Sequence, residues 1–180
     1  MRTFKKIILV VAVLIAGLFI VGLFTKKEYS IEREITINKP KQEVFGFIKY
    51  LNNQKKFNKW VMTDPNVRIE NRGTDGTVGF VSAWESDNKE VGKGVQQIKN
   101  IKEGERIDYE VQFIKPFEGK ADVYMTTEPV TDSQTKVKWG FSSGMKYPMN
   151  IMMIFMDIPG MLGKDMDTSL ENLKEHLEKQ

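Results

Sequence analysis

The sequence predicts an α+β protein in which one membrane-crossing helix precedes a seven-stranded, curved antiparallel sheet around a long C-terminal helix. Three observations lead to this class. An uncharged, apolar run occupies residues 7–24. Seven short stretches of strand-like sequence follow between turn signals, as is typical of antiparallel strands joined by tight turns. Near the C-terminus, residues 161–177 repeat apolar side chains at helical spacing.

The apolar run indicates a transmembrane helix. Its 18 residues span about 27 Å as a helix, close to the ~30 Å hydrocarbon core of a bilayer. A cleaved signal peptide is the alternative, but the run exceeds the usual apolar region, no A-x-A site follows it, and a lipoprotein site would need a cysteine. We therefore expect a membrane anchor at 1–27, with the helix at about 7–24, and a ligand-binding domain at 28–180.

After this run, a strand and two short helices are expected. Residues 29–37 alternate apolar and polar side chains, which predicts a half-buried strand. Pro40 suits the first turn of a helix, whose apolar positions then recur at helical spacing: Val44, Phe47, Ile48 and Leu51. A second short helix is expected to run toward Trp60.

Six further strands are predicted, at 67–71, 77–85, 90–101, 106–114, 120–128 and 135–143. Their side-chain parity gives one apolar face and one solvated face; on the strand 106–114, for example, Tyr109 and Phe113 lie opposite Glu110. Gly92 and Gly94 allow bulges or sharp curvature, and Pro129 is expected to end the fifth of these strands.

The last helix is expected to cover the apolar face of the sheet. Its apolar stripe comprises Met161, Leu162, Met166, Leu170, Leu173 and Leu177. Residues 149–158, just before it, are apolar nearly all round and are expected to stop at Pro159-Gly160. Because this helix is the only long amphipathic element, the sheet should curve around it and leave a pocket between them.

Three stretches resemble the bacterial SRPBCC proteins of the START/Bet v 1-like superfamily, in particular its polyketide cyclase/dehydrase and lipid-transport-like branch. They are 35–45 (ITINKPKQEVF), 84–94 (WESDNKEVGKG) and the last strand, which contains Trp139. The similarity covers residues 29–177. It implies a helix-grip fold with an apolar cavity. It supplies no shared catalytic set, because this fold serves binding proteins, transfer proteins, cyclases and chaperone co-activators.

The candidate pocket residues are aromatic side chains of the inner sheet face and methionines ahead of the last helix. Methionine suits surfaces that accept varied apolar ligands, although these methionines could equally fill a core or touch a membrane. The set is Trp60, Phe80, Trp84, Tyr109, Phe113, Phe117, Trp139, Phe141, Met152, Met153 and Met156. No catalytic residue is predicted: Asp165 and Asp167 are expected to be helix-surface charges, and His176 to complement the dipole of the last helical turn.

Composition excludes several functions. The chain has no cysteine and one histidine, which excludes disulfides, thiolate metal sites and multi-histidine centres. The net charge of +3 arises from residues 1–27, which carry five basic and no acidic residues, whereas the remainder carries 22 basic and 24 acidic residues. A nucleic-acid partner is therefore not expected, and neither a metal nor another cofactor is predicted.

These observations predict a single-pass membrane protein that binds, and in one version transfers, a hydrophobic small molecule or lipid. Two alternatives remain open: a polyketide cyclase/dehydratase-like enzyme, and a protein-interaction or chaperone co-activator module. Basic residues before the helix favour a cytoplasmic N-terminus and thus an extracytoplasmic domain, whereas Lys26 and Lys27 favour the opposite orientation. The sequence predicts no particular oligomeric state.

Overall fold

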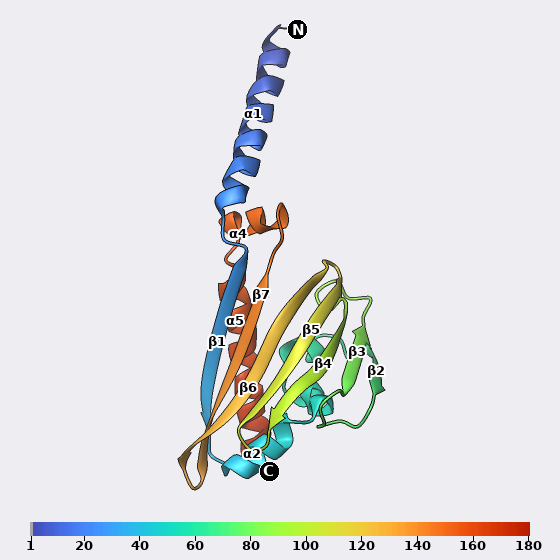
Figure 1. Cartoon of the computed structure of the whole chain (residues 1–180), viewed down its shortest axis with the longest axis vertical. Coiled ribbons are helices and arrows are strands. Elements are labelled where there is room, and N and C mark those ends of the chain that lie inside the picture. Colours follow the sequence, from blue (N-terminus) through green and yellow to red (C-terminus); the bar gives the residue numbers. More distant parts are fainter. Residues whose placement is uncertain (1) are drawn as a thin grey trace.

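The computed structural model describes residues 2–180 and has the predicted fold class (Figure 1). An isolated helix, α1 (Arg2–Phe24), leads into strand β1 (Glu28–Ile37). Three short helices follow: α2 (Lys41–Ile48), the 3-10 helix η1 (Leu51–Lys56) and α3 (Lys59–Met62). The other strands are β2 (Arg68–Arg72), β3 (Val81–Glu85), β4 (Lys93–Lys102), β5 (Arg106–Lys115), β6 (Gly119–Thr131) and β7 (Gln134–Gly144). The chain ends with η2 (Met149–Ile151), α4 (Met152–Phe155) and α5 (Ile158–Glu178).

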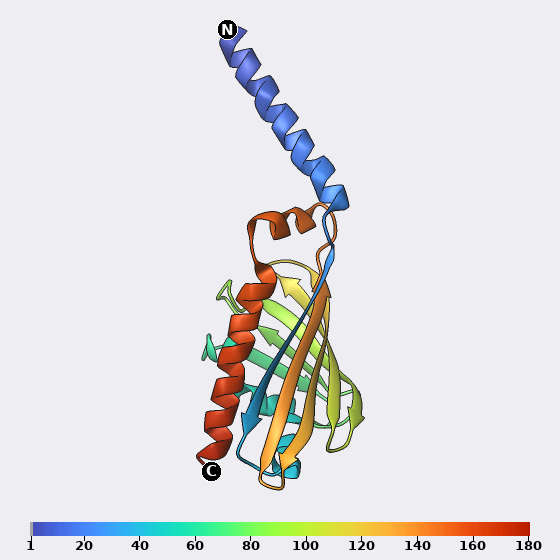
Figure 2. The same ribbon diagram turned by 90° about the vertical axis from the view of Figure 1, so that its left-hand side faces the viewer.

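The strands form one antiparallel sheet in the order β1-β7-β6-β5-β4-β3-β2. Every strand after β1 pairs with its predecessor or successor in the chain, and β1 closes the other edge by pairing with β7. Helix α5 runs alongside the curved sheet, as the turned view shows (Figure 2). All five residues of strand β2 are exposed and three are charged, which protects an edge strand from pairing with other chains.

The apolar stripe of α5 is the centre of the core. Met166, Leu170, Leu173 and Leu177 are at most 1% exposed and pack with the inner faces of the strands and with α2. The helix starts earlier than its stripe: Asp157 caps it by accepting a hydrogen bond from Gly160 N at 3.0 Å, and Pro159 lies in the first turn. The expectation that Pro159-Gly160 ends the preceding apolar segment was therefore wrong, since proline suits a helical first turn.

Two strand boundaries also differ from expectation. The strand predicted at 77–85 begins only at Val81, because Gly76 and Gly79 have φ of +76° and +90° and turn the chain before it. Strand β6 continues through Pro129, where a register shift relative to β7 accommodates the missing N–H. The predicted irregularity at Gly94 is confirmed by a register shift between β4 and β5.

Helix α1 is exposed along almost its whole length. Residues Thr3–Phe24 are long and apolar enough to cross a membrane, a property that membrane spans share with signal sequences. The helix projects from the end of the molecule that carries α4 (Figure 1).

We expect Leu173→Ala to destabilise the fold by about 2–5 kcal/mol, because a fully buried leucine side chain leaves a cavity when truncated. Thermal unfolding followed by circular dichroism measures this loss. Met161→Ala on the same helix is the control: Met161 is 56% exposed, so its truncation should change stability by less than about 0.5 kcal/mol. Equal losses in the two variants would contradict the assigned core.

Candidate ligand-binding cavity

A cavity of about 490 Å³ lies between the sheet, the short helices and the start of α5. Its wall draws on η1, α3, strands β2 to β7 and Leu162 of α5. This volume lies within the range of pockets that enclose drug-sized molecules. The exposed charged side chains in the wall, Lys55, Glu90 and Lys115, mark its rim, whereas the interior side is mainly aromatic and aliphatic.

Six of the eleven predicted pocket residues line this cavity: Trp60, Trp84, Tyr109, Phe113, Trp139 and Phe141. The other five lie elsewhere. Phe80 is packed in the core at 2% exposure, and Phe117 is 57% exposed on the β5–β6 loop. Met152 belongs to α4, and Met153 and Met156 border an open hollow beneath α1.

The aromatic wall is one continuous row of rings across the sheet. Trp84 meets Phe113 edge-on at 6.2 Å between ring centroids, and Phe113 lies 6.5 Å from Phe141. Ala121 of the intervening strand β6 is small, so rings on β5 and β7 approach each other above it. Such ring pairs contribute about 0.5–1.5 kcal/mol beyond their burial and fix the shape of the wall.

Gly94 of β4 creates the space that Trp84 occupies. A Cβ at this position would lie 2.3 Å from Cζ2 of Trp84 and 2.7 Å from the backbone oxygen of Gln112. Trp84 is also held by its indole N–H, which donates to Val91 O at 3.1 Å. The Trp84 ring therefore packs directly on the backbone at Gly94, a position that any side chain at residue 94 would block.

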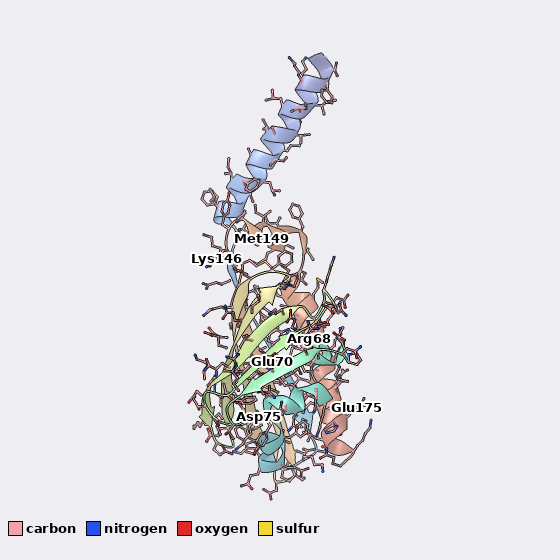
Figure 3. All side chains as sticks on the ribbon, turned by 90° about the vertical axis from the view of Figure 1, so that its right-hand side faces the viewer. Arg68, Glu70, Asp75, Lys146, Met149 and Glu175 are labelled. Carbon is pink, nitrogen blue, oxygen red and sulfur yellow. The ribbon has the colours of Figure 1, made fainter. Side chains whose placement is uncertain are left out.

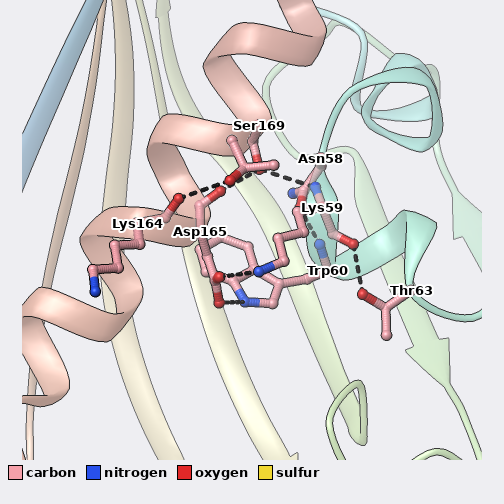
Figure 4. Close-up of polar contacts among 8 residues, drawn as sticks. Asn58, Lys59, Trp60, Thr63, Lys164, Asp165 and Ser169 are labelled. Atoms are coloured by element: carbon pink, nitrogen blue, oxygen red, sulfur yellow. Dashed lines mark hydrogen bonds and ion pairs between the residues drawn. The ribbon is translucent and has the colours of Figure 1, made fainter.

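A polar cluster fixes Trp60 at the side of the cavity near α5 (Figure 4). The Trp60 indole N–H donates to Asp165 Oδ2 at 3.2 Å, and the ammonium of Lys59 pairs with the other carboxylate oxygen. Lys59 N donates to Ser169 Oγ at 2.9 Å, and Asn58 caps α3 by accepting from Trp60 N at 3.0 Å. These contacts attach the short helix α3 to α5, which gives Asp165 a structural role.

Two buried polar groups in the cavity wall lack partners within the described residues 2–180. They are the Tyr109 hydroxyl and the Trp139 indole N–H, on residues that are 4% and 3% exposed. Burial raises the pKa of Tyr109 well above its ordinary value, and the nearby Trp139 N–H opposes that shift only in part. The Trp139 N–H is thus close enough to the Tyr109 hydroxyl to act on its pKa, although neither group has a partner in good hydrogen-bond geometry. Because an unpaired buried polar group costs about 1–3 kcal/mol, a partner supplied from the cavity would be stabilising.

The cavity wall contains four titratable side chains, of which Lys55, Glu90 and Lys115 lie at the rim and Tyr109 is buried. Across residues 2–180, no three histidine, cysteine, aspartate or glutamate side chains are arranged to hold a metal ion. The Tyr109 hydroxyl is protonated at neutral pH even at the ordinary tyrosine pKa, and burial raises that pKa further, so the group is available as a hydrogen-bond donor.

Solved structures with a similar fold are known. Norcoclaurine synthase from Thalictrum flavum, solved with dopamine and hydroxybenzaldehyde, matches with a TM-score of 0.62 at 13% identity, over 89% of this chain and 93% of that one. Ara h 8.0201 matches with a TM-score of 0.58 at 15% identity, over 85% and 99%. The Aha1 dimer protein from Colwellia psychrerythraea matches with a TM-score of 0.55 at 15% identity, over 83% and 96%.

The chain has the Bet v 1-like fold. No protein-family model matches the sequence, and no curated protein matches it significantly. The similarity to the structures is therefore a similarity of fold, and the predicted SRPBCC-type helix-grip architecture is confirmed at that level.

In this Bet v 1-like fold the cavity also has polar lining residues that the sequence analysis missed. Gln96 Nε2 donates to Gln54 Oε1 at 3.1 Å, and Ser82 is buried beside them in the wall. Parity could have identified Ser82, which shares a strand face with Trp84. The sequence held no comparable signal for Gln54, because the short 3-10 helix that buries it has no repeating pattern.

We expect Gly94→Ala to displace Trp84 and to destabilise the protein by about 1–3 kcal/mol, because the new methyl group overlaps the indole ring and a backbone oxygen. The shift of Trp84 should appear as a change in tryptophan emission. Gly119→Ala is the control, since its Cβ would meet only Phe113 at 4.0 Å. Unchanged emission and stability in Gly94→Ala would contradict the tight contact.

We expect Tyr109 to make stability fall at alkaline pH. Burial raises the pKa of Tyr109 in the folded protein, so above about pH 10 the unfolded chain loses this proton while the folded chain keeps it. The stability that protonated Tyr109 contributes is fully present below the pKa of the unfolded chain and is lost as pH rises toward the pKa of the folded protein. Thermal midpoints of the wild type should therefore fall relative to Tyr109→Phe between about pH 9 and pH 11. Parallel curves for the two proteins would contradict the buried assignment.

Proposed function

We propose that this protein is a single-pass membrane protein whose Bet v 1-like domain binds a hydrophobic small molecule or lipid carrying a hydrogen-bond acceptor. The observation that carries the proposal is the 490 Å³ cavity with an aromatic wall that contains two unpartnered donors, Tyr109 O–H and Trp139 N–H. Apolar burial of a ligand contributes about 25 cal/mol per Å², and the two donors select for an acceptor group.

The contrast among the three indole groups supports this assignment. All three tryptophans line the cavity. Trp60 donates to Asp165 and Trp84 donates to Val91 O, so their N–H groups are already satisfied by the protein. Trp139 has no such partner and lies 3% exposed. Because buried donors are almost always paired, Trp139 and Tyr109 are the two positions where a ligand would complete the wall.

Membrane anchoring by α1 forms the second half of the proposal. Twenty-two consecutive helical residues, Thr3–Phe24, span about 33 Å, which matches the hydrocarbon core. The helix is exposed almost throughout, so no core of the domain covers its apolar side chains. Residues 1–27 then act as the anchor and 28–180 as the binding domain, which we place outside the cytoplasm because Lys5 and Lys6 precede the uncharged run 7–24.

The cavity is tested by energy transfer from tryptophan to 1-pyrenebutanoate, with the full chain in lipid nanodiscs. We expect saturable transfer, because every tryptophan of the chain lines the cavity. Val111→Phe, which fills the wall, should weaken binding at least tenfold, whereas Val95→Phe on the half-exposed outer face of β4 should leave it unchanged. The proposal fails if the wild type shows no saturable transfer and organic extraction followed by mass spectrometry finds no bound molecule.

The donor pair is tested by comparing 1-pyrenebutanoate with unsubstituted pyrene. Tyr109→Phe should weaken binding of the acid about five- to tenfold, the equivalent of about 1–1.4 kcal/mol for one lost hydrogen bond, and leave pyrene binding unchanged. Its stability at neutral pH should stay equal or rise, since it removes an unpaired buried hydroxyl. Equal weakening of the binding of both probes would show that the Tyr109 hydroxyl does not bind the acceptor group.

A further inference from the structure

A short apolar segment lies directly beneath α1 and plays no part in the cavity. Residues 147–156, comprising η2, α4 and their flanks, are here called the 147–156 segment. They gather five of the exposed large apolar side chains outside α1: Tyr147, Met149, Ile154, Phe155 and Met156. Phe155 is 70% exposed, more than any other large apolar side chain outside α1 in the part of the chain described. A cluster of this kind usually marks an interaction surface.

The segment is fixed to the end of α1 by a buried asparagine. Asn150 is fully buried, and its Nδ2 donates to Gly22 O at 2.7 Å and to Thr25 O at 3.3 Å. These carbonyl groups belong to the end of a helix, where intrahelical partners run out. A Cβ on Gly22 would lie 2.5 Å from Cγ1 of Ile151. The 147–156 segment therefore keeps a set position against the last turns of α1.

We propose that the 147–156 segment lies in the membrane interface as a second membrane contact, with Phe155 and its apolar neighbours at the boundary between headgroups and acyl chains. This inference rests on the proposed membrane span of α1. When α1 crosses the bilayer, Gly22 and Thr25 lie where its hydrocarbon core ends. The segment bonded to them lies at the same depth, and α4 runs across the lower end of α1 (Figures 1 and 2).

The surroundings of the segment suit lipid headgroups. Lys26 and Lys27 follow α1, and Lys146 lies beside Met149 close to the same helix end (Figure 3). Lysines at this depth pair with lipid phosphates while their carbon chains stay near apolar groups. Glu28 and Asp157 are the nearby acidic residues, so the basic side chains outnumber them.

An open hollow of about 620 Å³ separates the segment from the start of β1. One wall consists of Met153, Ile154, Phe155 and Met156, and the other of Lys26, Glu28, Tyr29 and Ser30. An apolar wall facing a polar one matches the change in polarity across a lipid headgroup region. The occupant we assign to this surface is therefore the phospholipid bilayer.

This contact would hold the α5 side of the cavity near the bilayer. The chain runs from α4 through Asp157 into α5, whose Leu162 lines the cavity. The distance along the chain from Phe155 to Leu162 is seven residues. Two points of attachment, α1 and the segment, restrict rotation of the domain about the span and set one orientation of the cavity toward the membrane.

The test uses depth measurements on the full chain. The sequence has no cysteine, so single variants Ile15→Cys, Phe155→Cys and Val130→Cys each accept one nitroxide spin label. The labelled proteins are reconstituted in vesicles of phosphatidylcholine with phosphatidylglycerol, and collision rates with oxygen and with a water-soluble nickel chelate are compared. Val130 is the matched control, because it is an apolar residue of 50% exposure on β6, next to the β6–β7 turn.

We expect the label at 15 to be deep, the label at 155 to be oxygen-accessible and protected from nickel, and the label at 130 to be open to nickel. Gly22→Leu should move the label at 155 into water, whereas Gly17→Leu, with nothing within 4 Å of its Cβ, should not. The inference is overturned if the label at 155 is as accessible to nickel as the label at 130. It is also overturned if the label at 155 is shielded from both reagents, as in a protein contact. In either case a deep label at 15 leaves the proposed span intact. A water-exposed label at 15 overturns both.

Discussion

The structure depends on a mismatch of widths between the sheet and its covering helix. Seven strands about 4.8 Å apart make a face close to 30 Å wide, while one helix with its side chains is about 10–12 Å across. Helix α5 therefore covers only part of the apolar face, chiefly along β1. The sheet must curve and the short helices must cover the rest, and the cavity is the volume that they leave unfilled.

Side-chain parity in the strands and helical spacing in the helices predicted most of the fold. The stripe of α5 and the inner-facing rings of β5 and β7 are visible in the sequence because burial repeats with the period of the element. Boundaries depended on single residues instead. Gly79 turns the chain where the alternation suggested continued strand, and Pro159 opens a helix where it was expected to close a segment. In each case local backbone geometry overrode the hydrophobic pattern.

The sequence predicted only some of the residues that line the cavity, for a different reason. An inner-facing aromatic on a strand can only point into the core or the cavity, and five such rings, together with Trp60 of α3, line the cavity. Met152 and Met153 lie on the four-residue helix α4 and Met156 directly follows it, so no period is long enough to assign them a face. Their position follows from Asn150, whose hydrogen bonds to Gly22 and Thr25 join segments far apart in the chain, and no local pattern signals such a contact.

A ligand taken from the bilayer would change which interactions can drive binding. A hydrophobic molecule taken from water gains free energy from any apolar wall. The same molecule taken from a bilayer gains little from the rings of the cavity, because lipid tails are already apolar. The transfer is then decided by contacts that lipid tails cannot offer. The unpartnered Tyr109 hydroxyl and Trp139 N–H are such contacts, since a hydrogen bond is strongest where water is excluded. A protein that filled from the membrane would therefore depend on this pair far more than one that filled from water.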